Sequence, residues 1–197
     1  MLVSGMSIED RRARDREARR RLIISTARRL AESEGWDAVT TRRLSTEIEY
    51  SQPVLYKHFS GMEEIAAAVA IEGFAELGDA LATARAGAET PEDALRRIAH
   101  AHMNFARENP ALYDAMFSRA TTLRFAAADT PSELSASFAV LHDAVAAVAG
   151  GRDVDTLTEV FWAALHGLTT LARSHRLRPG YDSDRVELLA AQFSAAP

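Results

Sequence analysis

The chain has 197 residues, a formal net charge of −5 and a hydrophobic fraction of 47%, which supplies enough apolar material for a substantial core. It contains no cysteine, so disulfides, thiolate metal sites and cysteine nucleophiles are excluded. The arginine-rich start is not followed by the apolar segment of a secretory signal. No apolar run approaches the roughly 18 residues of a membrane span, so we expect a cytoplasmic protein.

The charge is divided unevenly along the chain. Residues 1–60 hold 12 Lys and Arg against 9 Asp and Glu, a balance of +3. Residues 61–197 hold 11 against 19, a balance of −8. Basic character is therefore concentrated in the first third, the distribution expected of a chain whose N-terminal part binds nucleic acid.

Residues 1–15 predict an arm that is rich in arginine. The arginines of this arm and of the residues just after it are Arg11, Arg12, Arg14, Arg16, Arg19, Arg20 and Arg21. They are either the solvated, charged start of a helix or contacts to DNA phosphates and an adjacent minor groove.

Residues 16–34 predict an amphipathic helix. Its apolar stripe, at the helical period, consists of Leu22, Ile23, Ala27 and Leu30. Gly35 is placed to end this helix, because glycine readily adopts the positive φ that commonly follows a helix C-terminus.

Residues 38–62 contain two short helical patterns joined by a tight turn. Thr40 is a good N-cap for the first pattern, because its hydroxyl accepts a hydrogen bond from a first-turn amide. Leu44 and Ile48 then lie on one face of the helix. The two residues after Ile48 make the turn.

The second pattern begins near Ser51 and carries Pro53 in its first turn, where a missing N–H costs little. Leu55 and Phe59 point into a core. The side chains left to face outward are Gln52, Val54, Tyr56, Lys57 and His58. Such a face is either ordinary solvated surface or a face equipped to contact base edges and phosphates in a DNA major groove.

Capping signals predict further helices. Ser60 and Glu63 form a capping box for a helix that runs to about Ala84. Thr90, followed by proline and two acidic residues, begins the next helix, and Thr130 begins a later one in the same way.

The rest of the chain is also helical by pattern. A short helix follows Asn109-Pro110, residues 118–129 have no consistent period and form a loop, and long helices cover 153–175 and 183–194. Because no stretch alternates with period two, we expect an all-α protein without a sheet.

The run Thr-Thr-Arg-Arg-Leu, a turn, then Gln-Pro-Val-Leu-Tyr-Lys-His-Phe resembles the helix-turn-helix of TetR-family transcriptional regulators over roughly residues 20–70. Trp162, His166 and Gly167 also resemble a Trp-x-x-x-His-Gly signature found in one subgroup of their C-terminal domains. The resemblance implies a three-helix DNA-binding module followed by a ligand-binding and dimerisation domain of about six helices. The expected divisions are an arm over 1–15, the helix-turn-helix domain over 16–60 and the effector and dimerisation domain over 61–197.

The resemblance also assigns the DNA-contacting residues. They are Thr40, Arg42, Arg43, Gln52, Pro53, Val54, Tyr56, Lys57 and His58. Two positions depart from the family pattern: Glu49 stands in the turn where many relatives have glycine, and Met62 stands where many have a lysine that meets phosphate. The arginines between residues 11 and 21 gain importance as a replacement for that missing anchor.

A stripe of small residues in 153–175 allows another helix to approach closely. Its members are Ala163, Gly167, Thr170 and Ser174, and this stripe either packs within the chain or forms a dimer seam. The resemblance favours a homodimer seam, completed by Val186, Leu189 and Phe193. Two recognition helices related by a two-fold axis would then meet major-groove faces about 34–36 Å apart, so the operator should be a near-palindrome.

Larger side chains on the inner faces are candidates for an effector pocket. They are Phe74, His102, Phe105, Tyr113, Phe117, Phe161, Trp162 and His166, and the alternative for each is plain core. No acidic residue lies on these faces, which favours an apolar or aromatic effector, with an acyl or carboxylate effector as the alternative.

The resemblance implies a transcriptional repressor that a small molecule releases from double-stranded DNA. A constitutive DNA-binding regulator without an effector and a helical enzyme are the alternatives. His100 and His102 are two residues apart and diverge on a helix, and neither a His-Glu-x-x-His motif nor a Gly-x-Ser-x-Gly motif is present. We therefore expect no catalysis, no metal and no cofactor.

Overall fold

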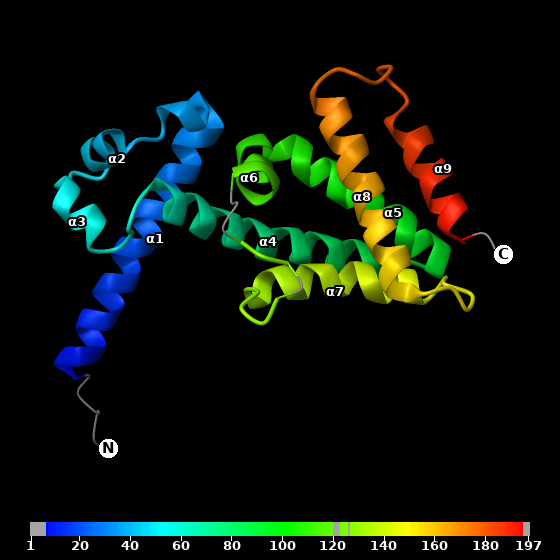
Figure 1. Cartoon of the computed structure of the whole chain (residues 1–197), viewed down its shortest axis with the longest axis horizontal. Helices are drawn as coiled ribbons and strands as arrows, with labels where there is room; N and C mark the ends of the chain where they lie inside the picture. Colours follow the sequence, from blue (N-terminus) through cyan, green and yellow to red (C-terminus); the bar gives the residue numbers. More distant parts are fainter. Residues whose placement is uncertain (1–6, 120–122, 126, 195–197) are drawn as a thin grey trace. The chain divides into compact units, whose positions relative to one another are not determined.

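The computed structural model describes residues 7–119, 123–125 and 127–194. All regular structure within these residues is helical and they contain no strand, as the sequence predicts (Figure 1). The start of the predicted arm and four residues of the predicted loop, 120–122 and 126, lie outside the described residues.

Helices make up most of the described chain. In chain order they are α1 Ile8–Glu34, the 3-10 helix η1 Trp36–Ala38, α2 Thr41–Glu47, α3 Gln52–Tyr56, α4 Met62–Ala86, α5 Pro91–Glu108, α6 Pro110–Asp114, the π-helix η2 Ala115–Arg119, α7 Ser132–Ala146, α8 Val154–Arg173 and α9 Asp182–Ser194. η2 occupies the first two residues of the predicted loop, 118 and 119.

The chain forms two compact units. The first holds the described residues up to Ala70 and the segment that begins at Ala111, and the second holds Ile71–Pro110 and the described residues from Leu123 onward. α6 thus belongs mostly with the N-terminal helices, although α5 and α7 belong to the second unit. A division of the chain at a single point cannot represent this arrangement.

α1 begins eight residues before the predicted helix start. Ser7 is its N-cap: the Asp10 amide donates to Ser7 Oγ at 3.1 Å, and the Ser7 amide donates to Asp10 Oδ2 at 3.2 Å. This reciprocal capping box extends the helix through residues that the sequence assigned to an arm. Leu22 is 42% exposed and leaves the predicted stripe, whose inner face is completed by Ile24.

Three helix starts test the predicted caps. The Asp93 amide donates to Thr90 Oγ1 at 3.1 Å, as predicted. At the start of α4, however, Glu64 and not Glu63 reaches back, accepting from the Ser60 amide at 2.7 Å, because the helix begins at Met62. Thr130 does not cap α7, since its hydroxyl accepts from the Ala127 amide and donates to the Arg124 carbonyl within the preceding turn.

The core of the second unit lies between α5, α7, α8 and α9. Leu95 and Ile98 of α5, Val145 of α7 and Phe161 of α8 are fully buried there. Phe161 meets Phe193 of α9 edge to face, with ring centroids 5.0 Å apart. Glycine at residue 78 of α4 lets α7 approach closely, because a Cβ there would lie 3.3 Å from Ser137 Cα, tighter than an ordinary contact. No helix among the described residues is both long and apolar enough to cross a membrane.

Candidate nucleic-acid interface

A small apolar core holds α2 and α3 against α1. Its buried side chains are Ile23, Ala27, Leu30, Trp36, Leu44, Ile48, Leu55 and Phe59. α2 starts where predicted, with the Arg43 amide donating to Thr40 Oγ1 at 3.1 Å. α3 follows Ser51 and carries Pro53 in its first turn. The short connection between them makes a helix-turn-helix (Figure 1).

The turn of this motif contains a non-glycine residue in the left-handed region. Glu49 has a φ of 56°. A Cβ in this conformation lies close to its own carbonyl oxygen and costs about 1–2 kcal/mol. The motif therefore folds with glutamate at this position, but at the expense of local backbone strain.

Glu49→Gly should stabilise the protein by up to about 1 kcal/mol, because glycine adopts this φ without the Cβ penalty and loses part of that gain to its more flexible unfolded state. Urea unfolding measures the change. Glu49→Ala is the control, since it removes the carboxylate and keeps the Cβ. A glycine variant no more stable than the alanine variant would show that the turn is not strained.

The outward face of α3 is exposed as predicted. Tyr56 is 54% exposed, and Gln52 and Lys57 are also exposed, whereas Val54 and His58 are partly buried. Burial and then the positive charges of Arg19, Arg16, Arg20 and Lys57 lower the pKa of His58 below its ordinary value. Four cations therefore lie near the imidazole at the end of α3.

Arg20 fastens this end of α3 to α1. Its Nη1 donates to the His58 carbonyl at 2.9 Å and lies 3.4 Å from Glu64 Oε1. Its guanidinium also stacks over the Phe59 ring, 4.2 Å from the centroid. Arg20 is therefore a structural residue and is less available for DNA than its neighbours on α1.

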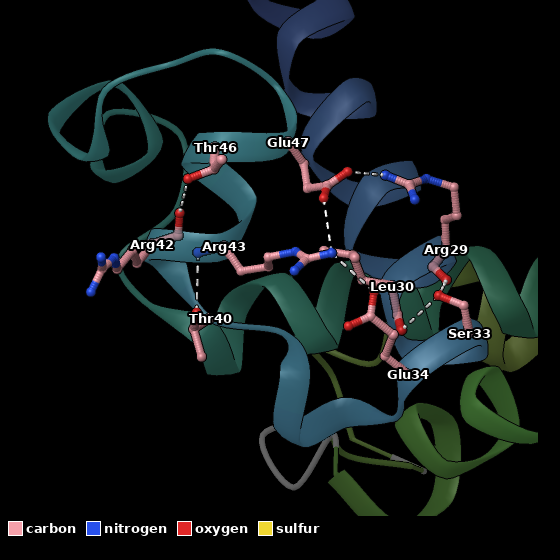
Figure 2. A network of polar contacts seen from close by, with 9 residues as sticks. All are labelled: Arg29, Leu30, Ser33, Glu34, Thr40, Arg42, Arg43, Thr46 and Glu47. Atoms are coloured by element: carbon pink, nitrogen blue, oxygen red, sulfur yellow. Dashed lines mark hydrogen bonds and ion pairs between the residues drawn. The ribbon is translucent and has the colours of Figure 1, made fainter.

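The structure gives two of the predicted DNA contacts another role. The Arg43 guanidinium bridges Glu34 at 3.0 Å and Glu47 at 3.1 Å, and Arg29 binds Glu47 at 2.8 Å (Figure 2). Hydrogen bonding from Arg29, assisted by Arg43, lowers the pKa of the Glu47 carboxyl. Arg43 thereby ties α2 to α1, and the Thr40 hydroxyl is used as a cap. Figure 2 shows Arg42 pointing away from this network.

α6 is joined to the end of α1 by contacts that the sequence did not reveal. The Ala111 and Leu112 amides donate to the Glu32 carboxylate at 3.1 and 2.9 Å. Trp36 Nε1 donates to the Ala111 carbonyl at 2.8 Å, and Arg119 pairs with Asp37 at 3.2 Å. Because these pairs are about 75 to 82 residues apart, no local pattern could have predicted them.

Two segments of the chain match described families. Residues 95–194 match the "Tetracyclin repressor-like, C-terminal domain", and residues 23–69 match the "Bacterial regulatory proteins, tetR family". The chain belongs to the TetR family. The family is one of transcriptional regulators, in agreement with the expected DNA-binding function.

Two relatives are described as HTH-type transcriptional regulators. YobS of Bacillus subtilis, an uncharacterized HTH-type transcriptional regulator, is 35% identical over 98 residues, which is 48% of this chain and 49% of YobS. A second uncharacterized HTH-type regulator, from Mycobacterium tuberculosis, is 28% identical over 163 residues, 81% of this chain and 72% of its own. The match thus spans about half the length of YobS.

Solved structures share the fold. A protein of unknown function from Rhodococcus sp. RHA1 superposes with a TM-score of 0.75 at 24% identity, covering 89% of this chain and 93% of its own. RolR, solved in complex with resorcinol, superposes with a TM-score of 0.63 at 19% identity, covering 92% and 88%. At these identities the likeness shows the TetR fold.

The eight residues predicted for an effector pocket of this TetR-family regulator are divided between the two units. Tyr113 and Phe117 belong to the first unit, with ring centroids 4.5 Å apart, and the other six belong to the second. Of those six, Phe74, His102, Phe105 and Phe161 are buried, whereas Trp162 and His166 are partly exposed. The helical period predicts which side chains face inward, but it does not distinguish a side chain of the core from one that lines a cavity.

His102 is a core histidine. It is 0% exposed, and burial, followed by the charge of His166, lowers its pKa to about 4. The imidazole is therefore neutral at physiological pH.

A groove lies between α4 and α7, and one of the predicted pocket residues, Phe74, lines it. Its volume is about 340 Å³, and Phe74 lies at one end. The remaining lining residues are small or apolar, apart from the carboxylates of Asp79 and Glu133. Phe74 also contacts Phe125, which in turn contacts Trp162, with centroids 5.5 and 5.6 Å apart.

The predicted seam residues divide between surface and core. Ala163, Thr170 and Ser174 are exposed, Gly167 and Leu189 are partly exposed, and a Cβ on Gly167 would meet nothing within 4 Å. Val186 and Phe193 are instead buried in the core of their own chain. The expectation that they lie on the surface of a seam is therefore corrected. Val160 and Leu171 of α8 and Leu188 of α9 are large apolar side chains that face outward, at 53%, 39% and 63% exposure.

Proposed function

We propose that this TetR-family regulator is a homodimeric repressor that binds a near-palindromic operator and is released by a small molecule. The observation that carries the DNA-binding part is the exposed face of α3. Tyr56, Lys57 and Gln52 stand out from a helix that is fixed in a buried core, which is the geometry of a recognition helix in a major groove.

The outward face of α8 and α9 supports the dimer. Val160 of α8 and Leu188 of α9 leave a large apolar area exposed to water. The small residues Ala163, Gly167 and Thr170 on the Val160 face of α8 permit a close approach of another helix. A two-fold axis through this face would present two copies of α3, each to one half-site.

The groove between α4 and α7 supports the effector part. Its volume of about 340 Å³ is at the small end of ligand sites, which suits a molecule of one or two rings. RolR, which shares the fold, was solved with resorcinol, a one-ring phenol. An effector that binds one dimer geometry better than the other lowers operator affinity by that difference.

The test measures binding to duplex DNA selected from random sequences, with and without a panel of small aromatic and apolar compounds. Preference for one selected sequence, followed by its loss with one compound, supports the proposal. Operator binding that no compound changes favours the constitutive regulator. Binding of all duplexes with equal affinity would contradict sequence-specific regulation.

Tyr56→Ala and Lys57→Ala should each weaken operator binding about tenfold without lowering the unfolding midpoint, because both side chains are exposed. Lys57→Ala should also reduce the slope of log affinity against log salt by about 0.9, the contribution of one phosphate contact. Fluorescence anisotropy over a salt series measures both quantities. Arg124→Ala, which removes an exposed charge from the second unit, is the control, and loss equal to that control would remove both residues from the interface.

Lys57 allows a direct measurement, because it is the only lysine in the chain. Acetylation of its amine by an amine-reactive reagent should slow when operator DNA is added.

A further inference from the structure

We propose that a cleft between α1 and the end of α3 binds backbone phosphates of the DNA duplex beside the half-site that α3 reads. The proposal rests on the proposed DNA-binding function and adds to it a second, sequence-independent contact. The cleft is defined here by Arg12, Arg16, Arg19, Lys57 and His58.

Two adjoining hollows make up this cleft. One, of about 500 Å³, is lined by Arg12, Arg16, Lys57 and His58 together with Glu9, Ala13, Glu17 and Arg20. The other, of about 560 Å³, is lined by the same four residues together with Asp15 and Arg19. The shared residues show that both hollows open onto one basic surface.

Helical spacing places the arginines on the α3 side of α1. Residues 12, 16 and 19 follow one another at steps of four and three, so they share one face. Arg20, on the edge of that face, holds the His58 carbonyl at 2.9 Å and fixes the distance between α1 and the end of α3. The Ser7–Asp10 capping box keeps Arg12 in regular helix and completes the cleft at its outer end.

The cationic groups of the cleft are not neutralised within the described part of the chain. Arg20, Arg21, Arg29 and Arg43 each have a carboxylate partner, whereas Arg12, Arg16, Arg19 and Lys57 have none among residues 7–119, 123–125 and 127–194. The acids at the rim offset this charge only in part.

Those acids are Glu9, Asp15 and Glu17. Glu17 is paired with Arg21 at 3.6 Å, and four cations therefore face two uncommitted carboxylates. The lowered pKa of His58, caused by burial and then by Arg19, Arg16, Arg20 and Lys57, is consistent with the resulting positive potential.

A duplex phosphate is the anion that fits this surface best. The cleft is open and elongated along α1, and it adjoins the helix whose exposed side chains reach into the groove. A DNA backbone places successive phosphates along such a surface, and Arg and Lys together neutralise them with release of counterions. The start of α4 carries Met62 and no cation, so the cleft supplies an anchor that α4 does not.

The experiment compares two double variants that lose the same charge from the same helix. Arg12→Gln/Arg16→Gln removes two cleft cations. Arg11→Gln/Arg14→Gln removes two exposed arginines that do not line the cleft, and Arg14 lies on the opposite face, about 200° from both Arg12 and Arg16. Affinity is measured over a salt series for the selected operator and for a scrambled duplex.

The cleft variant should lose about tenfold in affinity for both duplexes and about 1.8 in salt slope, because two phosphate contacts are removed and no base contact is. The control should keep the wild-type slope within about 0.5. Equal losses in the two variants would show that only the general charge of α1 matters, and unchanged slopes in both would show that the cleft is not occupied; either result overturns the proposal.

The outcome is separable from the proposed function. If wild-type protein does not prefer the selected operator to the scrambled duplex, sequence-specific regulation fails, whatever the cleft variant does. If wild-type protein does prefer it and the cleft variant behaves like the control, the cleft proposal alone fails. Thermal unfolding of each variant confirms that the helix is intact.

Discussion

In the proposed homodimer, Gly167→Leu should convert the dimer to a monomer and reduce operator affinity by about 100-fold or more. Gly167 lies on the outward face of α8 between exposed Ala163 and Thr170, and a Cβ there meets nothing within its own chain. A leucine at this point would hold two close-packed α8 helices apart. Each monomer would then bind one half-site, without the gain of about 10²–10⁴ that linking two binding events provides.

The same substitution should not unfold the chain. Leucine favours a helix over glycine by up to about 1 kcal/mol, so a loss of dimer cannot be explained by a weakened α8. Sedimentation velocity and unfolding in urea therefore give independent readouts. Ala139→Leu, which adds a leucine side chain at an exposed small residue of α7, is the matched control and should remain dimeric.

Leu188→Arg provides a second route to the same result. It places a charge on the outward face of α9, at a side chain that is 63% exposed and contributes little to its own chain's core. If both variants sediment as wild-type dimers, the seam does not involve this face of α8 and α9.

Sequence patterns predicted the elements that depend on local chemistry. Thr40, Thr90 and Pro53 mark helix starts because their effect is complete within one turn. Gly35 ends α1 at positive φ for the same reason. The exposed face of α3 was also predictable, because Leu55 and Phe59 must be buried and the residues on the opposite side of the helix are then exposed.

Predictions failed where two helix faces are both apolar or where a partner lies far along the chain. On α9, Val186 and Phe193 face the core while Leu188 faces outward. Because both faces carry apolar residues, the sequence period does not tell which face is buried. The family resemblance assigned Arg43 to DNA contact and could not show its ion pair with Glu34, because Glu34 lies on another helix. Pocket residues were indistinguishable from core for a similar reason, since both are apolar and inward-facing.

Glu32→Ala should destabilise the protein by about 2–4 kcal/mol, because it leaves the amides of Ala111 and Leu112 without their acceptor. Both residues are buried, at 7% and 0% exposure, so water cannot readily replace the carboxylate. Urea unfolding measures the loss. Glu34→Ala is the matched control: its carboxylate makes an exposed ion pair with Arg43, so its removal should cost less than about 1 kcal/mol.

Trp36→Phe tests the same junction from the other side. It removes the buried Nε1–H that donates to the Ala111 carbonyl at 2.8 Å and should cost about 1–3 kcal/mol. Because Glu32 and Trp36 hold opposite sides of one peptide segment, the double variant should lose less than the sum of the two single losses. A loss of stability in the double variant equal to the sum of the two single losses would show that the two contacts act independently and that α6 is not held as one element.

This junction also bears on how an effector would act. The segment from Ala111 belongs to the DNA-binding unit, while Ile71–Pro110 and the described residues from Leu123 onward belong to the unit that holds the α4–α7 groove. In the proposed mechanism, a change in the second unit would reach the first along the chain, within α4 or at the start of α6, where the chain crosses between the units. If α6 transmits it, Glu32→Ala should weaken the release of operator by effector more than it weakens operator binding itself. The ratio of operator affinities with and without effector measures this coupling, and an unchanged ratio would leave α4 as the route of transmission.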